Sequence, residues 1–157
     1  MPSFYEAWFN QAVTAGVLGK ADLMKTSYQR AGELRPGAVE VPRNLGRYYL
    51  HQKEYAQAQA CFEKALELTP EAPQSYNDLG EVQRLQNRLE EAVASFQKAL
   101  ALKADYAPAH YNLGLTYAGG KRAQEAIEHF EAYLKCSPQA SDAEEVRGWI
   151  AKLKQQP

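Results

Sequence analysis

The chain has 157 residues, 45% of them hydrophobic and 24% charged, which is the composition of a soluble globular protein with one core. Its formal net charge of −1 gives no overall field that would attract nucleic acid or an anionic membrane. No apolar run reaches the roughly 18 residues of a membrane span, so we expect neither a nucleic-acid partner nor a membrane-spanning segment.

The N-terminal stretch MPSFYEAWFNQAV has no basic leader followed by an apolar run, so no signal peptide is expected in this chain. Cys61 and Cys136 are far apart in sequence and form no C-x-x-C motif, which favours a reducing, cytoplasmic setting. Cys136 aligns with leucines in the repeat described next and is expected to be a small core residue, whereas Cys61 is expected to be half exposed.

A period of 34 residues divides residues 5–140 into four blocks without insertion or deletion. The blocks are residues 5–38, 39–72, 73–106 and 107–140. A small residue recurs at the eighth position, another at the twentieth position of the last three blocks, and an aromatic residue at the twenty-fourth. These residues are Ala12, Gly46, Gly80 and Gly114 at the eighth position, Ala58, Ala92 and Ala126 at the twentieth, and Tyr28, Phe62, Phe96 and Phe130 at the twenty-fourth.

Each block predicts two antiparallel helices joined by a short polar turn. Within residues 55–68, the residues Ala58, Phe62, Ala65 and Leu66 follow the i, i+4, i+7, i+8 spacing of one helical face. The small residues would let the two helix backbones approach closely. A proline near the end of three blocks predicts where the second helix stops.

The first block is the least regular of the four. Phe4, Tyr5, Trp8 and Phe9 crowd its first helix, and no earlier helix in the repeat pattern covers them. Two interpretations stay open: these aromatic residues pack inward, or they contact a partner or an upstream segment.

Residues 141–155 follow the last block and predict one more helix. Val146, Trp149, Ile150 and Leu153 would form its apolar face. We expect this helix to cap the exposed end of the last repeat, because each repeat buries its apolar surface only against a neighbour.

The recurring positions resemble the signature W-L-G-Y-A-F-A-P of the tetratricopeptide repeat. The second block matches seven of the eight positions, the fourth block six and the third block five, while the first block is divergent. The resemblance implies an all-α fold, a right-handed superhelix of four helix-turn-helix repeats with a C-terminal capping helix. It also implies a non-catalytic scaffold that binds a peptide segment of a partner protein. The matching residues of the second block are Leu45, Gly46, Tyr49, Ala58, Phe62, Ala65 and Pro70.

No group of residues has the spacing of a catalytic or metal site. His51, His110 and His129 form no metal-binding motif, and the Gly-Gly-Lys of residues 119–121 lacks the first glycine and the Ser or Thr of a phosphate-binding loop. We therefore expect no enzymatic activity, no cofactor and no bound metal.

In tetratricopeptide arrays the first helices of the repeats line a concave groove, and the resemblance implies which residues here would contact a bound peptide. They combine amides, charges of both signs and apolar side chains. These candidate groove residues are Arg43, Asn44, Arg47, Asn77, Asp78, Glu81, Arg84, Tyr111, Asn112 and Leu115.

Asn44, Asp78 and Asn112 occupy the same position of successive blocks. A side-chain amide offers both a donor and an acceptor to a peptide backbone, and this column resembles the asparagine ladder of the O-linked N-acetylglucosamine transferase superhelix. The other interpretation is that asparagine is only a tolerated polar residue at this position. Asp78 replaces the amide with an acceptor-only carboxylate.

A second use of the family is the dicarboxylate clamp that holds the C-terminal tails of heat-shock chaperones. The matching positions here are Arg43, Arg47, Asp78, Pro108 and Asn112, of which only Arg43 has the required type. Asp78 would repel a carboxylate, so we expect that clamp to be absent.

The charged middle of the groove has two interpretations. Arg47 and Arg84 would either meet acidic groups of a partner or pair with Glu81 and Asp78 in neighbouring repeats. The sequence does not name the partner. Two alternative functions also stay open, namely self-association through the aromatic first helix and service as the repeat part of a larger enzyme.

Overall fold

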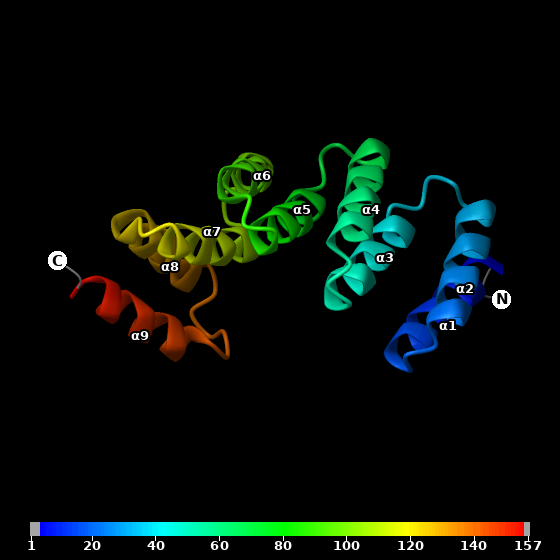
Figure 1. The fold of residues 1–157 in the computed structure, drawn as a ribbon, viewed down its shortest axis with the longest axis horizontal. Coiled ribbons are helices and arrows are strands. Elements are labelled where there is room, and N and C mark those ends of the chain that lie inside the picture. The colour runs from blue at the N-terminus through cyan, green and yellow to red at the C-terminus, as the bar shows by residue number, and fades with distance from the viewer. Residues whose placement is uncertain (1–3, 156–157) are drawn as a thin grey trace. The chain divides into compact units, whose positions relative to one another are not determined.

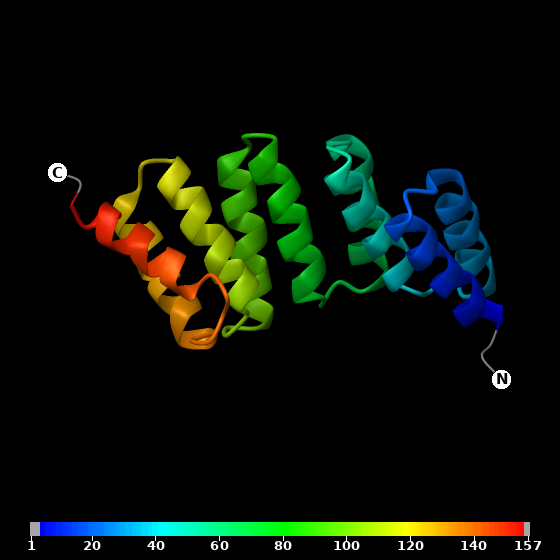
Figure 2. The ribbon, with the colours of Figure 1, turned by 90° about the horizontal axis from the view of Figure 1, so that it is seen from below.

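The computed structural model describes residues 4–155, and these form nine α-helices without a strand, which confirms the predicted all-α fold. The chain divides into two compact units, Met1–Pro70 (unit 1) and Glu71–Pro157 (unit 2). In both units the helices come in adjacent antiparallel pairs, as Figures 1 and 2 show. The helix-turn-helix interpretation of the 34-residue period is therefore correct.

Unit 1 contains two helix pairs, and its core lies between the first pair and the beginning of the third helix. The helices are α1 (Phe4–Val17), α2 (Ala21–Leu34), α3 (Glu40–His51) and α4 (Tyr55–Leu68). Tyr5 and Phe9 stack with ring centroids 5.7 Å apart, and Phe9 meets Tyr28 edge-on at 5.7 Å. The inward interpretation is therefore right for Tyr5, Phe9 and the partly buried Trp8, whereas Phe4 is 81% exposed.

Unit 2 contains two helix pairs and one further helix. The helices are α5 (Pro73–Leu85), α6 (Leu89–Leu102), α7 (Ala107–Gly119), α8 (Ala123–Cys136) and α9 (Ala143–Leu153). One continuous core runs from α6 through α7 and α8 to α9, where Val146 and Ile150 are buried. Figure 2 shows α5, α6 and α7 side by side, and buried residues of α6 and α7 belong to this one core.

In the last three helix pairs, the eighth-position glycine allows the phenylalanine ring to fill the space between the two helices. Phe62, Phe96 and Phe130 are fully buried. A Cβ atom built on Gly80 would stand 2.7 Å from the Phe96 ring, and the other two glycines are as close to their own rings. Such a contact is shorter than real Cβ atoms make, so the ring occupies the volume that any side chain would need.

The turn inside each helix pair repeats one backbone conformation. One residue per block has a positive φ and the first helix ends in a Schellman motif, as in the bonds from Lys121 N to Ala118 O (3.1 Å) and from Arg122 N to Tyr117 O (2.9 Å). The same two bonds recur in the other three turns. The positive-φ residues are Gly19, Lys53, Asn87 and Lys121, with φ values of 69°, 60°, 61° and 58°.

The second helices end at the same place whether or not proline follows. α2, α4 and α8 end two residues before Pro36, Pro70 and Pro138. α6 ends at the equivalent Leu102, although Ala104 stands where the other blocks have proline. The residue after each of these helices donates its backbone N–H to the carbonyl four residues earlier and then turns extended, so the end does not depend on the proline.

The expected burial of Cys136 is wrong, because Cys136 is exposed in the last turn of α8. The leucines of its column, Leu34, Leu68 and Leu102, are also exposed in large part. This position therefore faces outward at the end of each second helix. Cys61 is half-buried on α4, as expected.

Candidate functional site

The candidate groove residues of unit 1 lie on α3. Arg47 is exposed, and Arg43 and Asn44 are half-buried. The Asn44 side chain hydrogen-bonds the hydroxyl of Tyr28, a residue of α2. Burial raises the pKa of Tyr28, and the bond from Asn44 opposes this rise. Asn44 therefore has a partner inside the unit, and Arg43 and Arg47 are the side chains with charge to offer a ligand.

The asparagines of unit 2 contact each other. Asn112 Nδ2 donates to Asn77 Oδ1 at 3.1 Å, which joins α7 to α5. The two residues are only 8% and 6% exposed. The hydroxyl of Thr116 also donates to the Asn112 carbonyl, at 2.6 Å. A buried amide pair of this kind stabilises the packing of the first helices, because an amide left buried and unpaired would be costly.

The other candidate residues of unit 2 remain accessible. Asp78, Glu81, Arg84, Tyr111 and Leu115 are half-buried. Within the described residues of unit 2, no ion pair joins Arg84 to Glu81. The predicted pairing of Arg47 and Arg84 with Glu81 and Asp78 stays a prediction. The ion pairs found between residues 71 and 155 include three between residues three positions apart and one from Lys154, just after α9, to Glu131 of α8.

Arg84 has a buried nitrogen without an acceptor. Among the described side chains, its Nε and the hydroxyl of Ser75 are the buried polar atoms that lack a hydrogen-bond partner. Burial, together with the carboxylates of Asp142 and Glu145, raises the pKa of the Tyr111 hydroxyl, and the Arg84 guanidinium opposes this rise. Protein atoms cover Nε, whereas the side chain as a whole is half-buried, so a ligand oxygen would form its charge-assisted hydrogen bond with the exposed part of the guanidinium group.

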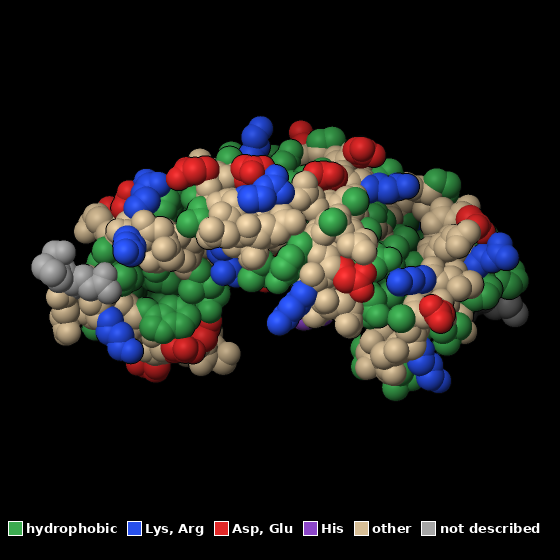
Figure 3. All heavy atoms as spheres, viewed as in Figure 1, with side chains coloured by type: hydrophobic (Ala, Val, Ile, Leu, Met, Phe, Trp, Pro, Cys, Tyr) green, Lys and Arg blue, Asp and Glu red, His purple; other side chains and the backbone are tan. Residues whose placement is uncertain are grey.

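The last helix adds an aromatic residue that sequence reasoning assigned only to capping. Trp149 of α9 lies 6.1 Å from Tyr111 and 5.5 Å from Phe130, between ring centroids. Figure 3 shows hydrophobic side chains gathered where α9 meets α7 and α8, with acidic and basic side chains at the edge. The sequence shows the apolar pattern of α9. It does not show that Trp149 contacts Tyr111, because no local signal determines the direction in which a capping helix runs.

Asp142, the residue before α9, is hydrogen-bonded to Tyr133 of α8. The hydroxyl of Tyr133 donates to Asp142 Oδ1 at 2.5 Å. Burial, together with this bond and the charge of Asp142, raises the pKa of Tyr133 to about 12. The bond holds the beginning of α9 against α8 and so places Trp149 beside Tyr111.

Two negative findings apply to residues 4–155. No group of three or more His, Cys, Asp or Glu side chains lies close enough to hold a metal ion. None of the helices found there is long and apolar enough to cross a bilayer.

Two family models, both described as tetratricopeptide repeat, match residues 37–105 and 83–153. Together with the repeated helix pairs, these matches show that the chain belongs to the tetratricopeptide repeat family. A comparison with curated proteins gives no match.

Three solved structures illustrate the proteins whose fold is similar to that of this chain. The crystal structure of MamA protein has 23% sequence identity and a TM-score of 0.75, with 99% of this chain and 88% of that chain covered. The TPR2B-domain:pHsp70-complex of yeast Sti1 has 20% identity and a TM-score of 0.70, with 76% and 98% covered. The first TPR of Spaghetti (RPAP3), bound to the HSP90 peptide SRMEEVD, has 21% identity and a TM-score of 0.70, with 74% and 93% covered. At these identities the likeness is one of fold.

Proposed function

We propose that this chain is a non-catalytic scaffold that binds a segment of a partner protein on the surface of its first helices. The observation that carries the proposal is Arg84, a half-buried cation of α5 that forms no ion pair within the described residues and whose charge acts on the Tyr111 hydroxyl. Two proteins of the same fold are described in complex with pHsp70 and with an HSP90 peptide, which supports peptide binding by this fold.

The chemistry of unit 2 favours a segment with a carboxylate next to an apolar side chain. A carboxylate would accept from the Arg84 guanidinium, and the apolar side chain would contact Leu115 and the rings of Tyr111 and Trp149. The chaperone-type clamp contributes nothing to this proposal, because Asp78 stands where that clamp needs a donor.

The buried asparagines have a supporting part in the proposal. Asn77 and Asn112 keep α5 and α7 in register, so that Asp78, Glu81 and Arg84 of α5 stand next to α7. In unit 1, Arg43 and Arg47 form a separate basic surface on α3, next to Asn44.

The test compares Arg84→Gln with wild type. Partners captured by the wild-type chain are identified, and their affinities are measured by calorimetry. We expect Arg84→Gln to weaken binding about tenfold or more, because a hydrogen bond to a charged group contributes about 1.5–3 kcal/mol. Arg147→Gln is the matched control, since Arg147 is an exposed residue of α9 paired with Glu144. Unchanged affinity in Arg84→Gln and Arg47→Glu, with both variants folded, would contradict the proposal.

Self-association through the first helix is the second candidate. Of the aromatic residues that suggested it, Tyr5 and Phe9 pack inward, so this function would depend on Phe4, which is 81% exposed. Sedimentation at high concentration decides: a concentration-dependent dimer that Phe4→Ala abolishes supports it, and a monomer at all concentrations removes it.

A further inference from the structure

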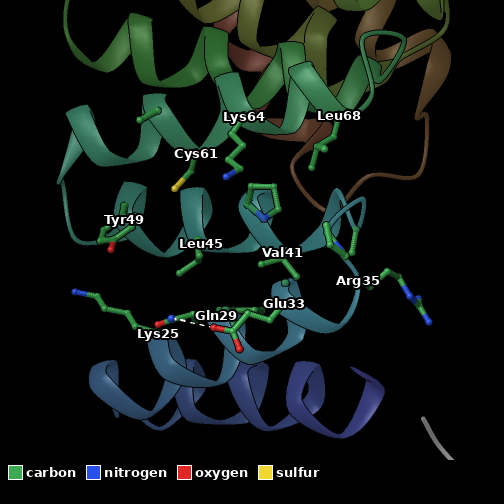
Figure 4. Close-up of a pocket in the computed structure, with 16 residues that line it drawn as sticks. Lys25, Gln29, Glu33, Arg35, Val41, Leu45, Tyr49, Cys61, Lys64 and Leu68 are labelled. Atoms are coloured by element: carbon green, nitrogen blue, oxygen red, sulfur yellow. Dashed lines mark hydrogen bonds between the residues drawn. The ribbon is translucent and has the colours of Figure 1, made fainter. Parts of the chain in front are cut away.

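Unit 1 has an open cavity at the junction between its two helix pairs. Its volume is about 720 Å³, within the range of pockets that enclose a bound molecule. Residues of α2, α3 and α4 line it, and Figure 4 shows Leu45 and Val41 of α3 between the other two helices. In Figure 3 the same place is a hollow lined by hydrophobic side chains between α2 and α4, with basic side chains at its edge.

The cavity has a cause in the sequence. Gly32 of α2 lines it and occupies the block position at which the three later blocks have Leu66, Leu100 and Leu134. Leu100 and Leu134 pack against the core of unit 2. A Cβ atom on Gly32 would meet only Val41 Cγ1, at an ordinary contact distance of 3.9 Å, so a larger side chain has room there. The junction in unit 1 therefore lacks one leucine side chain that the repeat normally supplies.

The rim of the cavity is basic. Lys25 of α2 and Lys64 of α4 line it, and within the described residues neither forms an ion pair. Figure 4 shows the Lys64 ammonium group in the space between α4 and α3, and the Lys25 ammonium group at the edge, next to Tyr49. Glu33, the acidic lining residue, already accepts from Arg30 at 2.9 Å and from Gln29 at 3.1 Å.

A further basic residue at the edge does not add to this charge. The guanidinium carbon of Arg35 lies 3.8 Å from the centroid of the Tyr5 ring. Arg35 Nη2 also forms an ion pair with Glu6 Oε1 at 3.6 Å. Figure 4 shows it directed away from the cavity. The charge offered to a ligand therefore comes from Lys25 and Lys64.

This surface is separate from the candidate groove. α3 contributes Val41 and Leu45 to the cavity, whereas Arg43, Asn44 and Arg47 of the same helix do not line it. Neighbouring positions of one helix thus serve two different faces.

We propose that the cavity is a second docking surface, which takes aliphatic, leucine-like side chains of a partner segment that carries acidic residues beside them. A leucine of the partner would occupy the space that is empty because Gly32 has no side chain. The partner's carboxylates would pair with Lys25 and Lys64. Helical segments commonly present apolar anchors of this kind to grooves between helices. The proposal is independent of the function assigned to Arg84.

The probe is a short blocked peptide with two leucines one helical turn apart and glutamates on its other face. Two matched peptides replace the glutamates with lysines or the leucines with alanines. Binding to the full chain is followed by the NMR shifts of backbone amides. We expect saturable shifts at Gly32, Leu45 and Lys64 with the first peptide. The alanine peptide should bind at least about tenfold more weakly, since each buried methylene changes affinity about fourfold. The lysine peptide should also bind more weakly, because its charges repel Lys25 and Lys64.

Three variants separate docking in the cavity from binding elsewhere. Gly32→Leu fills the cavity and should abolish the shifts. Gly148→Leu, at an exposed glycine of α9 with no atom within 4 Å of its Cβ position, should leave them unchanged. The double variant Lys25→Glu/Lys64→Glu should bind the lysine peptide better than the glutamate peptide.

The results that overturn the proposal are specific. Equal binding of the glutamate and lysine peptides, or unchanged binding to Gly32→Leu, contradicts it. Shifts confined to Arg43 and Arg47, or lost in Arg84→Gln, would assign the peptide to the groove instead. If decanoate occupies the cavity and the leucine peptide does not, the surface binds a small amphiphile and the partner-segment proposal is wrong.

Discussion

The eighth-position glycines Gly46, Gly80 and Gly114 each lie against the phenylalanine ring of their own helix pair. Replacing Gly80 with alanine would place a Cβ atom 2.7 Å from the fully buried Phe96 ring, so the ring or the backbone must move. We expect Gly80→Ala to lower the free energy of unfolding by about 1–3 kcal/mol, the usual cost of overpacking. Urea unfolding monitored by circular dichroism measures it.

Gly148→Ala is the control for the same substitution. Its Cβ would meet no atom within 4 Å, on the exposed side of α9. Alanine is the better helix former by about 0.8–1 kcal/mol, so this variant should be slightly more stable than wild type. If Gly80→Ala and Gly148→Ala change the free energy of unfolding equally, the contact with Phe96 is not the reason that glycine is required at position 80.

The positive-φ residues of the turns make a second prediction. Lys121 has a φ of 58°, a conformation that costs a residue with a side chain about 1–2 kcal/mol. Glycine removes this cost but gains freedom in the unfolded chain, so Lys121→Gly should raise the free energy of unfolding by about 0.5–1 kcal/mol. Asn87→Gly should gain less, because asparagine tolerates this region. The measurement is urea unfolding; destabilisation by Lys121→Gly contradicts it.

The two thiols should differ in reactivity. Cys136 is exposed at the end of α8, whereas Cys61 is half-buried beside the cavity of unit 1. Burial raises the pKa of the Cys61 thiol, which reduces its reactive thiolate fraction. With a disulfide reagent at mildly alkaline pH, Cys136 should react first and Cys61 more slowly. Gly32→Leu should slow Cys61 further. Equal rates in Cys61→Ser and Cys136→Ser would contradict this order.

At the scale of elements, a pair of histidines joins α7 to α8. His110 Nε2 lies 3.1 Å from the Ala104 carbonyl, which only accepts, so His110 donates there and its Nδ1 accepts. His129 Nδ1 is 3.0 Å from His110 Nδ1 and must be the donor. The His129 ring also stacks on Tyr117, with centroids 5.5 Å apart.

This pair predicts a pH dependence of stability. Burial, and next the charge of His110, hold the pKa of His129 below its ordinary 6.5, while Glu128 raises it slightly. The unfolded chain therefore takes up a proton before the folded chain does. The contribution of neutral His129 to the free energy of unfolding is fully present above about pH 6.5. It declines as the pH falls toward the lowered pKa of His129 in the folded chain. Urea unfolding between about pH 7.5 and 5.5 should show the decline.

The variant His129→Phe tests whether this residue causes the decline. It keeps an aromatic ring next to Tyr117 and removes the titrating group, so the loss of stability between about pH 6.5 and 5.5 should become smaller. An NMR titration of His129 that gives a pKa at or above 6.5 would contradict the prediction.

At the scale of the whole molecule, the repeat period predicted the helices because every block obeys the same local rules. Apolar spacing fixed the faces of the helices, and the glycine and aromatic columns located the contacts inside each pair. The helix ends were predicted correctly for an incomplete reason, since α6 ends without its proline. The predicted burial of Cys136 is wrong because the leucines of its column are themselves largely exposed, so leucine at this position does not indicate a core residue.

The candidate site was harder to predict because it depends on contacts between repeats. Position alone placed Asn112 in the groove, but its bond to Asn77 uses a residue one position away in the preceding block. Trp149 reaches Tyr111 only through the direction of α9. Gly32 interrupts a column of leucines, a signal in the sequence that becomes a cavity only when α2, α3 and α4 are placed in space.

The division into two units predicts unequal stability of the separated parts. Unit 2 has a continuous core from α6 to α9, and its last helix is held by the bond from Tyr133 to Asp142. Unit 1 is shorter and has an open cavity at its inner junction in place of a leucine. Because short domains bury a smaller fraction of their surface, residues 71–157 alone should unfold cooperatively, and residues 1–70 alone should be less stable.

Thermal unfolding of the two separate fragments, followed by circular dichroism, tests this order. Gly32→Leu should raise the free energy of unfolding of fragment 1–70 by about 1–2 kcal/mol, because leucine has a better helix propensity and buries apolar surface against Val41. The difference in stability between the two fragments should therefore become smaller. The same substitution is expected to remove the docking of a leucine-bearing segment. A fragment 1–70 that is already as stable as fragment 71–157, or that Gly32→Leu destabilises, would show that the cavity does not weaken unit 1.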